Sequence, residues 1–271
     1  MRQRIFYLLV MLFCLTSPAA KAQVGNAEPH PALSAYEKHL FITESNDTLP
    51  YRLLTPEHPT KGQRYPLVLF LHGAGERGND NAKQLTHGAQ MWLNPVNRSE
   101  RPCFVLAPQC PLSGYWAYNE RPTSFVPEEM PLAKEPSRIY PLLKALLMSY
   151  VGRPDVDPNR IYVIGLSMGG MATYDIVVRN PQLFAAAIPI CGTINPSRLE
   201  ALKGSPTAFR LFHGDADPVV TVEGSRQAYR QLKAAGVRID YHEFPGCTHG
   251  SWNPAFGCDD FMSWLFSQQK R

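Results

Sequence analysis

Residues 161–170 read Ile-Tyr-Val-Ile-Gly-Leu-Ser-Met-Gly-Gly, and this stretch decides the fold. The first four residues are apolar and mostly β-branched, which predicts a buried strand. Gly165 to Gly169 then match Gly-x-Ser-x-Gly, a sharp strand-to-helix turn that exposes a serine hydroxyl. Glycine is needed on both sides because backbone passes too close for a Cβ. We therefore predict that Ser167 is a nucleophile at a helix N-terminus, where free N–H groups favour negative charge.

Strand and helix patterns alternate along the rest of the chain. Strands are predicted at residues 39–43, 49–54, 66–71, 103–106, 161–164, 184–190, 208–212 and 238–244. Helices are predicted at residues 81–93, 137–151, 168–178, 222–235 and 259–269, with a short one after Asn195. The turn residues Asn46 and Asp47 join the first two strands. This alternation predicts an α/β fold, with a mostly parallel central sheet of about eight strands flanked by helices and ligands beyond the strands' carboxyl ends.

The start of the chain has the pattern of a secretory signal peptide. Arg2 and Arg4 make a basic beginning, an apolar run follows over residues 5–15, and Ala-Lys-Ala at 20–22 offers a cleavage site before Gln23. The apolar run is shorter than the roughly 20 residues that a membrane-spanning helix needs. The pattern therefore predicts an exported protein rather than an anchored one.

We accordingly expect residues 1–22 to be a signal peptide and residues 23–271 to be a single domain. The protein would be periplasmic or secreted, with no stable membrane anchor after cleavage. Cys14 raises the alternative of a lipoprotein signal, but the large Phe13 before it is unsuited to that processing.

The charge and the metal-ligand patterns exclude several classes of function. Loss of the signal peptide removes three basic residues and no acidic one, so the formal charge of +4 falls to about +1. No basic cluster remains that would predict nucleic-acid binding. No Cys-x-x-Cys or histidine-rich spacing predicts a metal site, and no cofactor is implied.

The remaining cysteines are five, so at least one is unpaired within the chain. Cys103 and Cys110 flank a predicted strand and are too far apart for a disulfide, so free thiols are expected there. Cys191 ends an apolar run and reads as a buried core thiol. Cys247 and Cys258 lie on either side of a loop, and an exported protein allows them either to bridge or to stay free.

A glycine-rich segment follows the strand that ends at Leu71. Residues 71–80 read Leu-His-Gly-Ala-Gly-Glu-Arg-Gly-Asn-Asp, and such a turn lets backbone N–H groups point into a site, as an oxyanion hole requires. The alternative is a phosphate-binding loop, but neither Gly-x-Gly-x-x-Gly nor a Gly-Lys-Ser/Thr ending is present. Glu76 and Arg77 either order this loop by pairing or face solvent.

Residues 212–220 follow a predicted strand and read Phe-His-Gly-Asp-Ala-Asp-Pro-Val-Val. They contain two candidates for the acid that would orient a catalytic histidine. Asp215 and Asp217 compete for this role. Pro218 fixes the turn directly after Asp217 and aims that carboxylate by rigid backbone, so Asp217 is favoured and Asp215 is expected to brace the loop.

In chains with a nucleophile elbow of this kind, the catalytic residues occur in the order serine, acid, histidine, so the base is expected after the acid. Only His242 and His249 follow the acid. His242 lies inside a strand pattern, which indicates a structural residue. His249 stands in Pro-Gly-Cys-Thr-His-Gly-Ser-Trp at 245–252, a loop of small residues after that strand, and is predicted to be the general base.

The chain as a whole resembles the α/β-hydrolase superfamily, and within it the bacterial phospholipase/carboxylesterases and dienelactone-hydrolase-like esterases, including feruloyl and acetylxylan esterases. The resemblance runs from about His39 onward and rests on the phrases at residues 71–78, 107–111, 165–170 and 213–220. It implies an α/β-hydrolase fold for the single domain. It also implies a catalytic Ser167, Asp217 and His249, with an oxyanion hole formed by the N–H groups of Ala74 and Met168.

The function implied is that of an exported serine carboxylic-ester hydrolase that works through an acyl-enzyme, without metal or cofactor. Its substrate would be a small-molecule or oligosaccharide ester. Two alternatives stay open. One is a serine peptidase of the prolyl-oligopeptidase-like class, and the other is a non-catalytic binding module with the same fold.

A proline-rich insert suggests the kind of ester. Residues 111–136 follow a strand end and contain the aromatic residues Tyr115, Trp116, Tyr118 and Phe125. Trp252 and Phe256 follow His249 and would face the insert across a cleft. Aromatic faces suit stacking on a sugar or phenolic ring, so Trp116 and Trp252 are predicted to bind substrate, an acyl or feruloyl ester of a carbohydrate. The alternative is that these rings only anchor the insert to the core.

Overall fold

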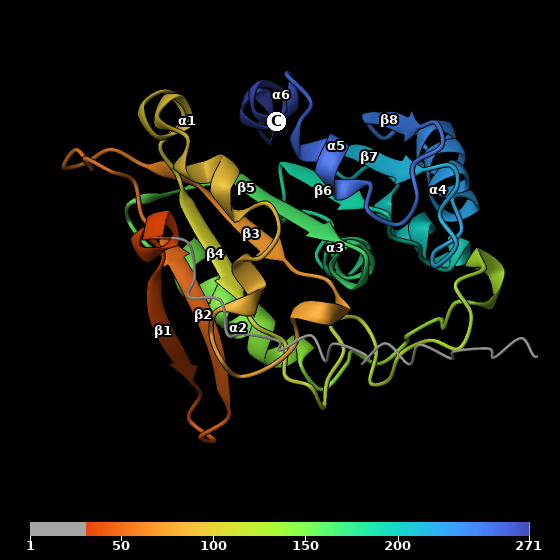
Figure 1. The fold of residues 1–271 in the computed structure, drawn as a ribbon, viewed down its shortest axis with the longest axis horizontal. Coiled ribbons are helices and arrows are strands. Elements are labelled where there is room, and N and C mark those ends of the chain that lie inside the picture. The colour runs from red at the N-terminus through yellow and green to blue at the C-terminus, as the bar shows by residue number, and fades with distance from the viewer. Residues whose placement is uncertain (1–30, 271) are drawn as a thin grey trace, which may run out of the picture.

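An eight-stranded sheet forms the centre of the computed structural model, which describes residues 31–270 (Figure 1). The strand order is β1-β2-β4-β3-β5-β6-β7-β8. β2 pairs antiparallel with both β1 and β4, and all other pairs of neighbouring strands are parallel. The strands are β1 (Glu37–Ile42), β2 (Thr48–Leu54), β3 (Tyr65–Leu71), β4 (Phe104–Pro108), β5 (Val156–Leu166), β6 (Ala186–Ile190), β7 (Ala208–Gly214) and β8 (Ile239–Phe244). The predicted α/β-hydrolase fold with about eight strands is confirmed.

Helices cover both faces of this sheet, as Figure 1 shows. The α-helices are α1 (Pro95–Glu100), α2 (Tyr140–Val151), α3 (Met168–Arg179), α4 (Glu223–Ala234), α5 (Trp252–Phe256) and α6 (Phe261–Ser267). Alternate residues of β3 explain the layering, because a strand turns successive side chains to opposite faces. Leu67 and Leu69 belong to the same core cluster as buried residues of α2, α3 and α4, whereas Val68 and Phe70 belong to a second cluster that includes buried residues of α6. Burial on both faces accounts for the unbroken apolar run of this strand.

The predicted helix at residues 81–93 is wrong. The segment instead holds two short 3-10 turns, η3 (Lys83–Leu85) and η4 (Ala89–Leu93). Gly88 between them has φ 75°, a left-handed conformation that ends a helix. A Cβ on this glycine would also lie 2.8 Å from the ring of Phe256. Glycine at this position therefore meets two requirements, a left-handed φ and the close approach of a ring far along the chain.

Smaller differences concern the other ends of elements. The predicted last helix begins later, at α6, and α5 before it was not predicted. The short helix after Asn195 is the 3-10 segment η6 (Pro196–Leu202). The elbow strand β5 starts before Pro158, in a stretch where the pairing with β3 shifts register. The other short 3-10 segments are η1 (Pro31–Ala35), η2 (Ala74–Glu76) and η5 (Pro127–Glu129).

The cysteines of the described residues are all free thiols. Cys103, Cys110 and Cys191 are buried, as predicted. Cys247 and Cys258 do not form the bridge that the sequence allowed. Each thiol is turned to a carbonyl close by in the chain, that of Thr248 at 3.5 Å for Cys247 and that of Pro254 at 3.4 Å for Cys258.

Within residues 31–270 no helix combines the length and the apolar character that crossing a bilayer requires. The predicted signal peptide at residues 1–22 lies outside the described residues.

Candidate active site

Ser167 lies in the turn between β5 and α3, where the sequence predicted an exposed nucleophile. Its backbone has φ 52° and ψ −114°, a strained conformation for a residue with a side chain. A Cβ on Gly165 would lie 2.2 Å from the carbonyl oxygen of Gly169, and a Cβ on Gly169 would lie 1.9 Å from that of Leu71. The Ser167 N–H donates to the Ile190 carbonyl at 2.9 Å. Close packing on both sides thus holds the strained turn in place.

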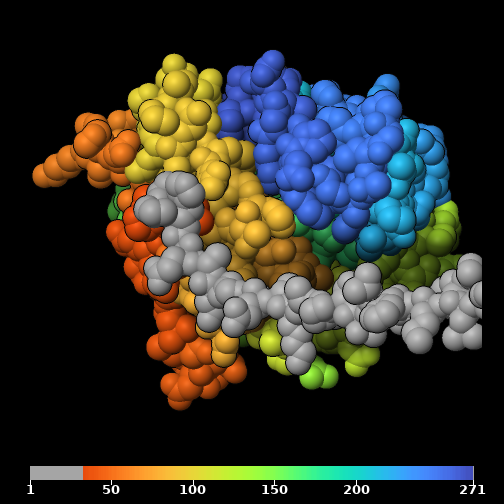
Figure 2. Space-filling model, in the orientation of Figure 1, coloured from red at the N-terminus to blue at the C-terminus, as the bar shows by residue number. Residues whose placement is uncertain are grey.

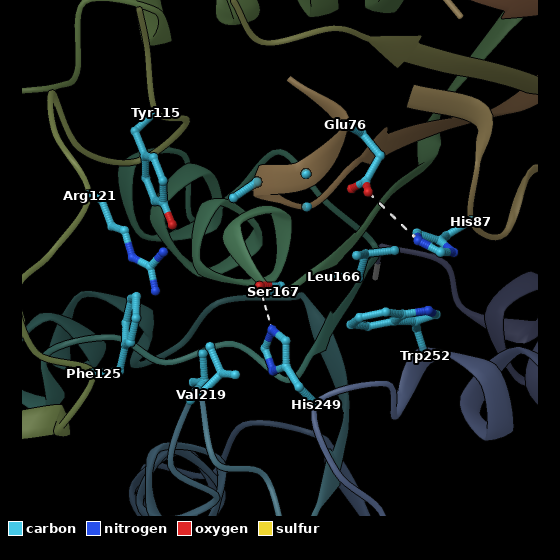
Figure 3. Close-up of a pocket in the computed structure, with 14 residues that line it drawn as sticks. Glu76, His87, Tyr115, Arg121, Phe125, Leu166, Ser167, Val219, His249 and Trp252 are labelled. Carbon is cyan, nitrogen blue, oxygen red and sulfur yellow. Dashed lines mark hydrogen bonds and ion pairs between the residues drawn. The ribbon is translucent and has the colours of Figure 1, made fainter. Parts of the chain in front are cut away.

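The structure brings the three predicted catalytic residues together at the carboxyl end of the sheet. His249 Nε2 lies 2.9 Å from Ser167 Oγ, and His249 Nδ1 lies 2.7 Å from Asp217 Oδ2 (Figure 3 shows the serine and histidine). Asp217 follows β7, and His249 follows β8. These distances allow a proton to pass from serine to histidine while the carboxylate fixes the imidazole.

Several donors keep the Asp217 carboxylate ionised. Burial alone would raise the pKa of this fully buried side chain, but hydrogen bonds from His213, His249 and the N–H groups of Val219 and Val220 outweigh it and hold the pKa well below its usual range. The low pKa means that Asp217 is charged at neutral pH.

His213 is a residue of this site that the sequence reasoning missed. It is fully buried, and its Nε2 lies 3.0 Å from the Val220 carbonyl and 3.3 Å from Asp217 Oδ2. Both neighbours accept hydrogen bonds, so Nε2 carries the proton, and Nδ1 accepts from the Ser225 hydroxyl at 2.7 Å. The signal was present in the sequence, because His213 stands four residues before the predicted acid on the same strand end.

Replacing His213 with leucine should lower kcat by about 10- to 100-fold, since one hydrogen bond to a charged group is worth roughly 1.5–3 kcal/mol. The other donors to Asp217 remain, so its carboxylate stays charged at neutral pH and the loss is that of one positioning contact. His213→Gln keeps an N–H donor and should recover part of the lost kcat. Steady-state kinetics of p-nitrophenyl acetate hydrolysis at neutral pH measure this, and an unchanged kcat in His213→Leu would contradict it.

The two rejected candidates lie away from the reacting atoms. Asp215 is exposed, and its Oδ1 accepts the Gly246 N–H at 2.6 Å, which braces the loop as predicted. His242 stands in β8 and stacks on Phe212 with ring centroids 5.1 Å apart. Both placements agree with structural rather than chemical roles.

The two predicted oxyanion-hole donors both stand at the first position of a helical segment. Met168 begins α3 and Ala74 begins η2, where N–H groups have no intrahelical acceptor. The buried His72 supports the loop that carries Ala74. Its Nδ1 donates to the Gly73 carbonyl at 2.6 Å, and its Nε2 accepts the Cys110 N–H at 3.0 Å. Burial lowers the pKa of His72 to about 4, which keeps this acceptor nitrogen unprotonated.

Trp116 does not line the cleft, which corrects the prediction that it binds substrate. Its side chain is 1% exposed, and its indole N–H donates to the His72 carbonyl at 3.2 Å. The ring therefore supports the oxyanion loop from beneath. Tyr118 is also buried and does not line this cleft, so these two rings anchor the insert to the core, the alternative left open by the sequence.

The cleft above Ser167 has a volume of about 280 Å³. Figure 3 shows Tyr115, Arg121 and Phe125 on one side of the serine and Glu76, His87 and Trp252 on the other. Trp252 thus lies where the sequence predicted it. His87 and Arg121 were not predicted, because neither belongs to a recognisable motif.

Within residues 31–270, one group of side chains has the geometry of a metal site. The ligand atoms of Cys191, Asp217 and His249 lie within 4.8 Å of one another. Asp217 and His249 are already hydrogen-bonded to each other. Burial raises the pKa of the Cys191 thiol far above its usual range, which disfavours the thiolate form that binds metal. The cluster fits a hydrogen-bonded triad better than a metal centre.

A family model described as the Dienelactone hydrolase family matches residues 117–259, which is more than half of the chain. The chain belongs to the dienelactone hydrolase family. The matched region of this dienelactone hydrolase family member includes Ser167 and Asp217 as well as His249.

The individual proteins to which this chain is similar are named as esterases or carboxylesterases. The crystal structure of a thermostable esterase is 35% identical, with a TM-score of 0.79, and covers 88% of this chain. The curated protein named Putative esterase NocK, from Nocardia uniformis subsp. tsuyamanensis, is 25% identical over 82% of this chain. A protein named as a probable carboxylesterase from Arabidopsis thaliana is 29% identical over 69% of this chain and 73% of its own length. The chain spans 64% of the thermostable esterase and 61% of NocK.

Proposed function

We propose that this protein is a serine hydrolase that cleaves carboxylic esters through an acyl-enzyme. The observation that carries the proposal is the chain of hydrogen bonds from Ser167 through His249 to Asp217, opening into a cleft. Family membership and the esterases among the relatives support it.

The proposed mechanism has two steps of acyl transfer. His249 takes the Ser167 proton as Oγ attacks the ester carbonyl, while Asp217 stabilises the imidazolium that forms. The N–H groups of Ala74 and Met168 stabilise the negative oxygen of the tetrahedral intermediate. His249 then gives its proton to the leaving alcohol, and water repeats the sequence on the acyl-enzyme to release the acid.

The finer part of the proposal is an exported enzyme that acts on acyl or feruloyl esters of carbohydrates. The basic and apolar start of the chain, with its Ala-x-Ala site, supports export to the periplasm or beyond the cell. Aromatic side chains support the substrate class, because Tyr115, Phe125 and Trp252 border the cleft. Trp116, which the sequence also predicted to bind substrate, is buried and does not border the cleft.

Pre-steady-state hydrolysis of p-nitrophenyl acetate tests the proposal. A burst of p-nitrophenol equal to the enzyme concentration, without cleavage of peptide anilides, is expected for an esterase that forms an acyl-enzyme. Efficient cleavage of the anilides would instead favour the peptidase alternative. No turnover of either substrate would favour a non-catalytic binding module.

A further inference from the structure

The wall of the cleft opposite the insert combines a carboxylate, an imidazole and an indole. Glu76 comes from the loop of the oxyanion hole, His87 from the turn between η3 and η4, and Trp252 from the start of α5. His87 and Trp252 are in ring contact, with centroids 5.1 Å apart. Figure 3 shows all three directed at the same part of the cleft.

This wall is assembled from segments far apart in the chain. His87 directly precedes Gly88, whose left-handed turn lies against the ring of Phe256. Figure 2 shows on one face of the molecule the gold surface of the β3–β4 connection next to the blue surface of the C-terminal segment, the two parts that supply His87 and Trp252. Because backbone and ring packing fix both residues, the wall is formed before any substrate binds.

The Glu76 carboxylate lines the cleft and accepts no hydrogen bond from a described side chain. Its side chain is 14% exposed, and His87 Nε2 lies 3.7 Å away, which is longer than a hydrogen bond. The carboxylate oxygens keep contact with solvent in the cleft, and a ligand with N–H or O–H donors can take the place of that solvent. The neighbouring imidazole offers both a donor and an acceptor.

The charges around the cleft favour a neutral ligand with hydroxyl groups over a cationic one. Arg121 lines the opposite side, and no carboxylate of the described residues lies within ion-pair distance of it. Asp217 is fully buried and hydrogen-bonded to His213 and His249, so among the described residues that line the cleft Glu76 is the carboxylate that a ligand reaches, and Arg121 on the opposite side offsets its charge. An ammonium group therefore gains little here, whereas hydroxyl groups are bound by short-range hydrogen bonds.

We propose that Glu76, His87 and Trp252 form the subsite for the sugar ring that supplies the leaving alcohol. Glu76 and His87 bind ring hydroxyls, and the indole face of Trp252 packs on the C–H face of the ring. This inference rests on the proposed esterase function and assigns one side of its cleft.

The position of the base indicates which half of the ester lies on this wall. The leaving oxygen must receive its proton from His249 Nε2. The His249 ring meets the Trp252 ring edge to face, with centroids 5.6 Å apart. An alcohol that departs next to His249 therefore lies along Trp252, and the acyl group is left to the side of Tyr115 and Phe125.

The test compares two esters with the same acyl group and different alcohols, acetylated xylo-oligosaccharides and p-nitrophenyl acetate. The measured quantity is the ratio of kcat/KM for the sugar ester to kcat/KM for the phenyl ester. Glu76→Gln removes the charge with little change of shape, and it should lower this ratio about tenfold, mainly through a higher KM for the sugar ester. His87→Gln should lower the ratio in the same direction.

Glu44→Gln is the matched control, because Glu44 is an exposed acid in the β1–β2 turn, outside the cleft, and its loss should not alter the ratio. An unchanged ratio in Glu76→Gln would overturn the subsite while p-nitrophenyl acetate hydrolysis still upheld the esterase function. Faster turnover of acetylcholine than of the sugar ester would also overturn it, in favour of a cation subsite. If the unmodified protein hydrolysed neither acetate ester, the esterase function and the subsite would fall together.

Discussion

Replacing Ser167 with alanine should reduce ester hydrolysis by about 10⁶-fold, to the level left by binding and the oxyanion hole. The hydroxyl within 2.9 Å of His249 is the nucleophile of the proposed mechanism, and no other described residue is placed to replace it. The fold should persist, because the change removes one oxygen from a turn that glycines and backbone contacts hold in place. Release of p-nitrophenol and the circular dichroism spectrum measure the two effects.

Ser263→Ala is the control for this experiment, since Ser263 is exposed on α6 and bonds only to the Asp260 carbonyl. It should keep full activity. A fluorophosphonate probe should label the unmodified protein on the peptide that contains Ser167 and should leave the Ser167→Ala variant unlabelled. Labelling of another serine, or near-normal turnover without Ser167, would refute the assignment of the nucleophile.

Replacing Asp217 with asparagine should lower kcat by about 10⁴-fold. An asparagine amide can turn an N–H toward His249 Nδ1, which stabilises the wrong tautomer and withdraws Nε2 as acceptor of the serine proton. It also removes the charge that stabilises the imidazolium. The kinetics of p-nitrophenyl acetate hydrolysis, with kcat separated from KM, measure the loss.

The chain contains a matched control two residues away. Asp215→Asn changes the same functional group on the same loop, but the side chain is exposed and only braces Gly246, so a small loss is expected. A severe effect of Asp215→Asn together with a mild effect of Asp217→Asn would exchange the two roles. His249→Ala and His242→Ala form the parallel pair for the base, with the large loss expected in His249→Ala.

The positions of the proposed catalytic residues were predictable from the sequence. The elbow at residues 165–169 is a local pattern, because the glycines and the preceding apolar strand are all that such a turn needs. The acid and the base each follow a parallel strand, and parallel strands bring their carboxyl ends to one edge of the sheet. Strand ends therefore implied that Asp217 and His249 would meet Ser167, which the structure brings about.

The partners of these residues were harder to predict. His213 and His72 each stand beside a recognised motif, yet nothing in the local pattern shows whether an imidazole supports a loop or faces solvent. Their roles follow from burial and from acceptors such as Asp217, which only the folded chain supplies. The same holds for Cys247 and Cys258, whose spacing allowed a bridge that the loop geometry does not make.

The sequence by itself determined the sheet, the elbow turn at Ser167 and the chain order of the proposed catalytic residues, because apolar periodicity and turn chemistry act over a few neighbouring residues. Only the tertiary structure decided which side chains face the cleft. Trp116 is buried and donates a hydrogen bond to the His72 carbonyl, 44 residues away in the chain. His87 lies in the cleft next to Gly88, where the Phe256 ring leaves no room for a Cβ. Such contacts depend on how distant segments pack, and no local pattern encodes them.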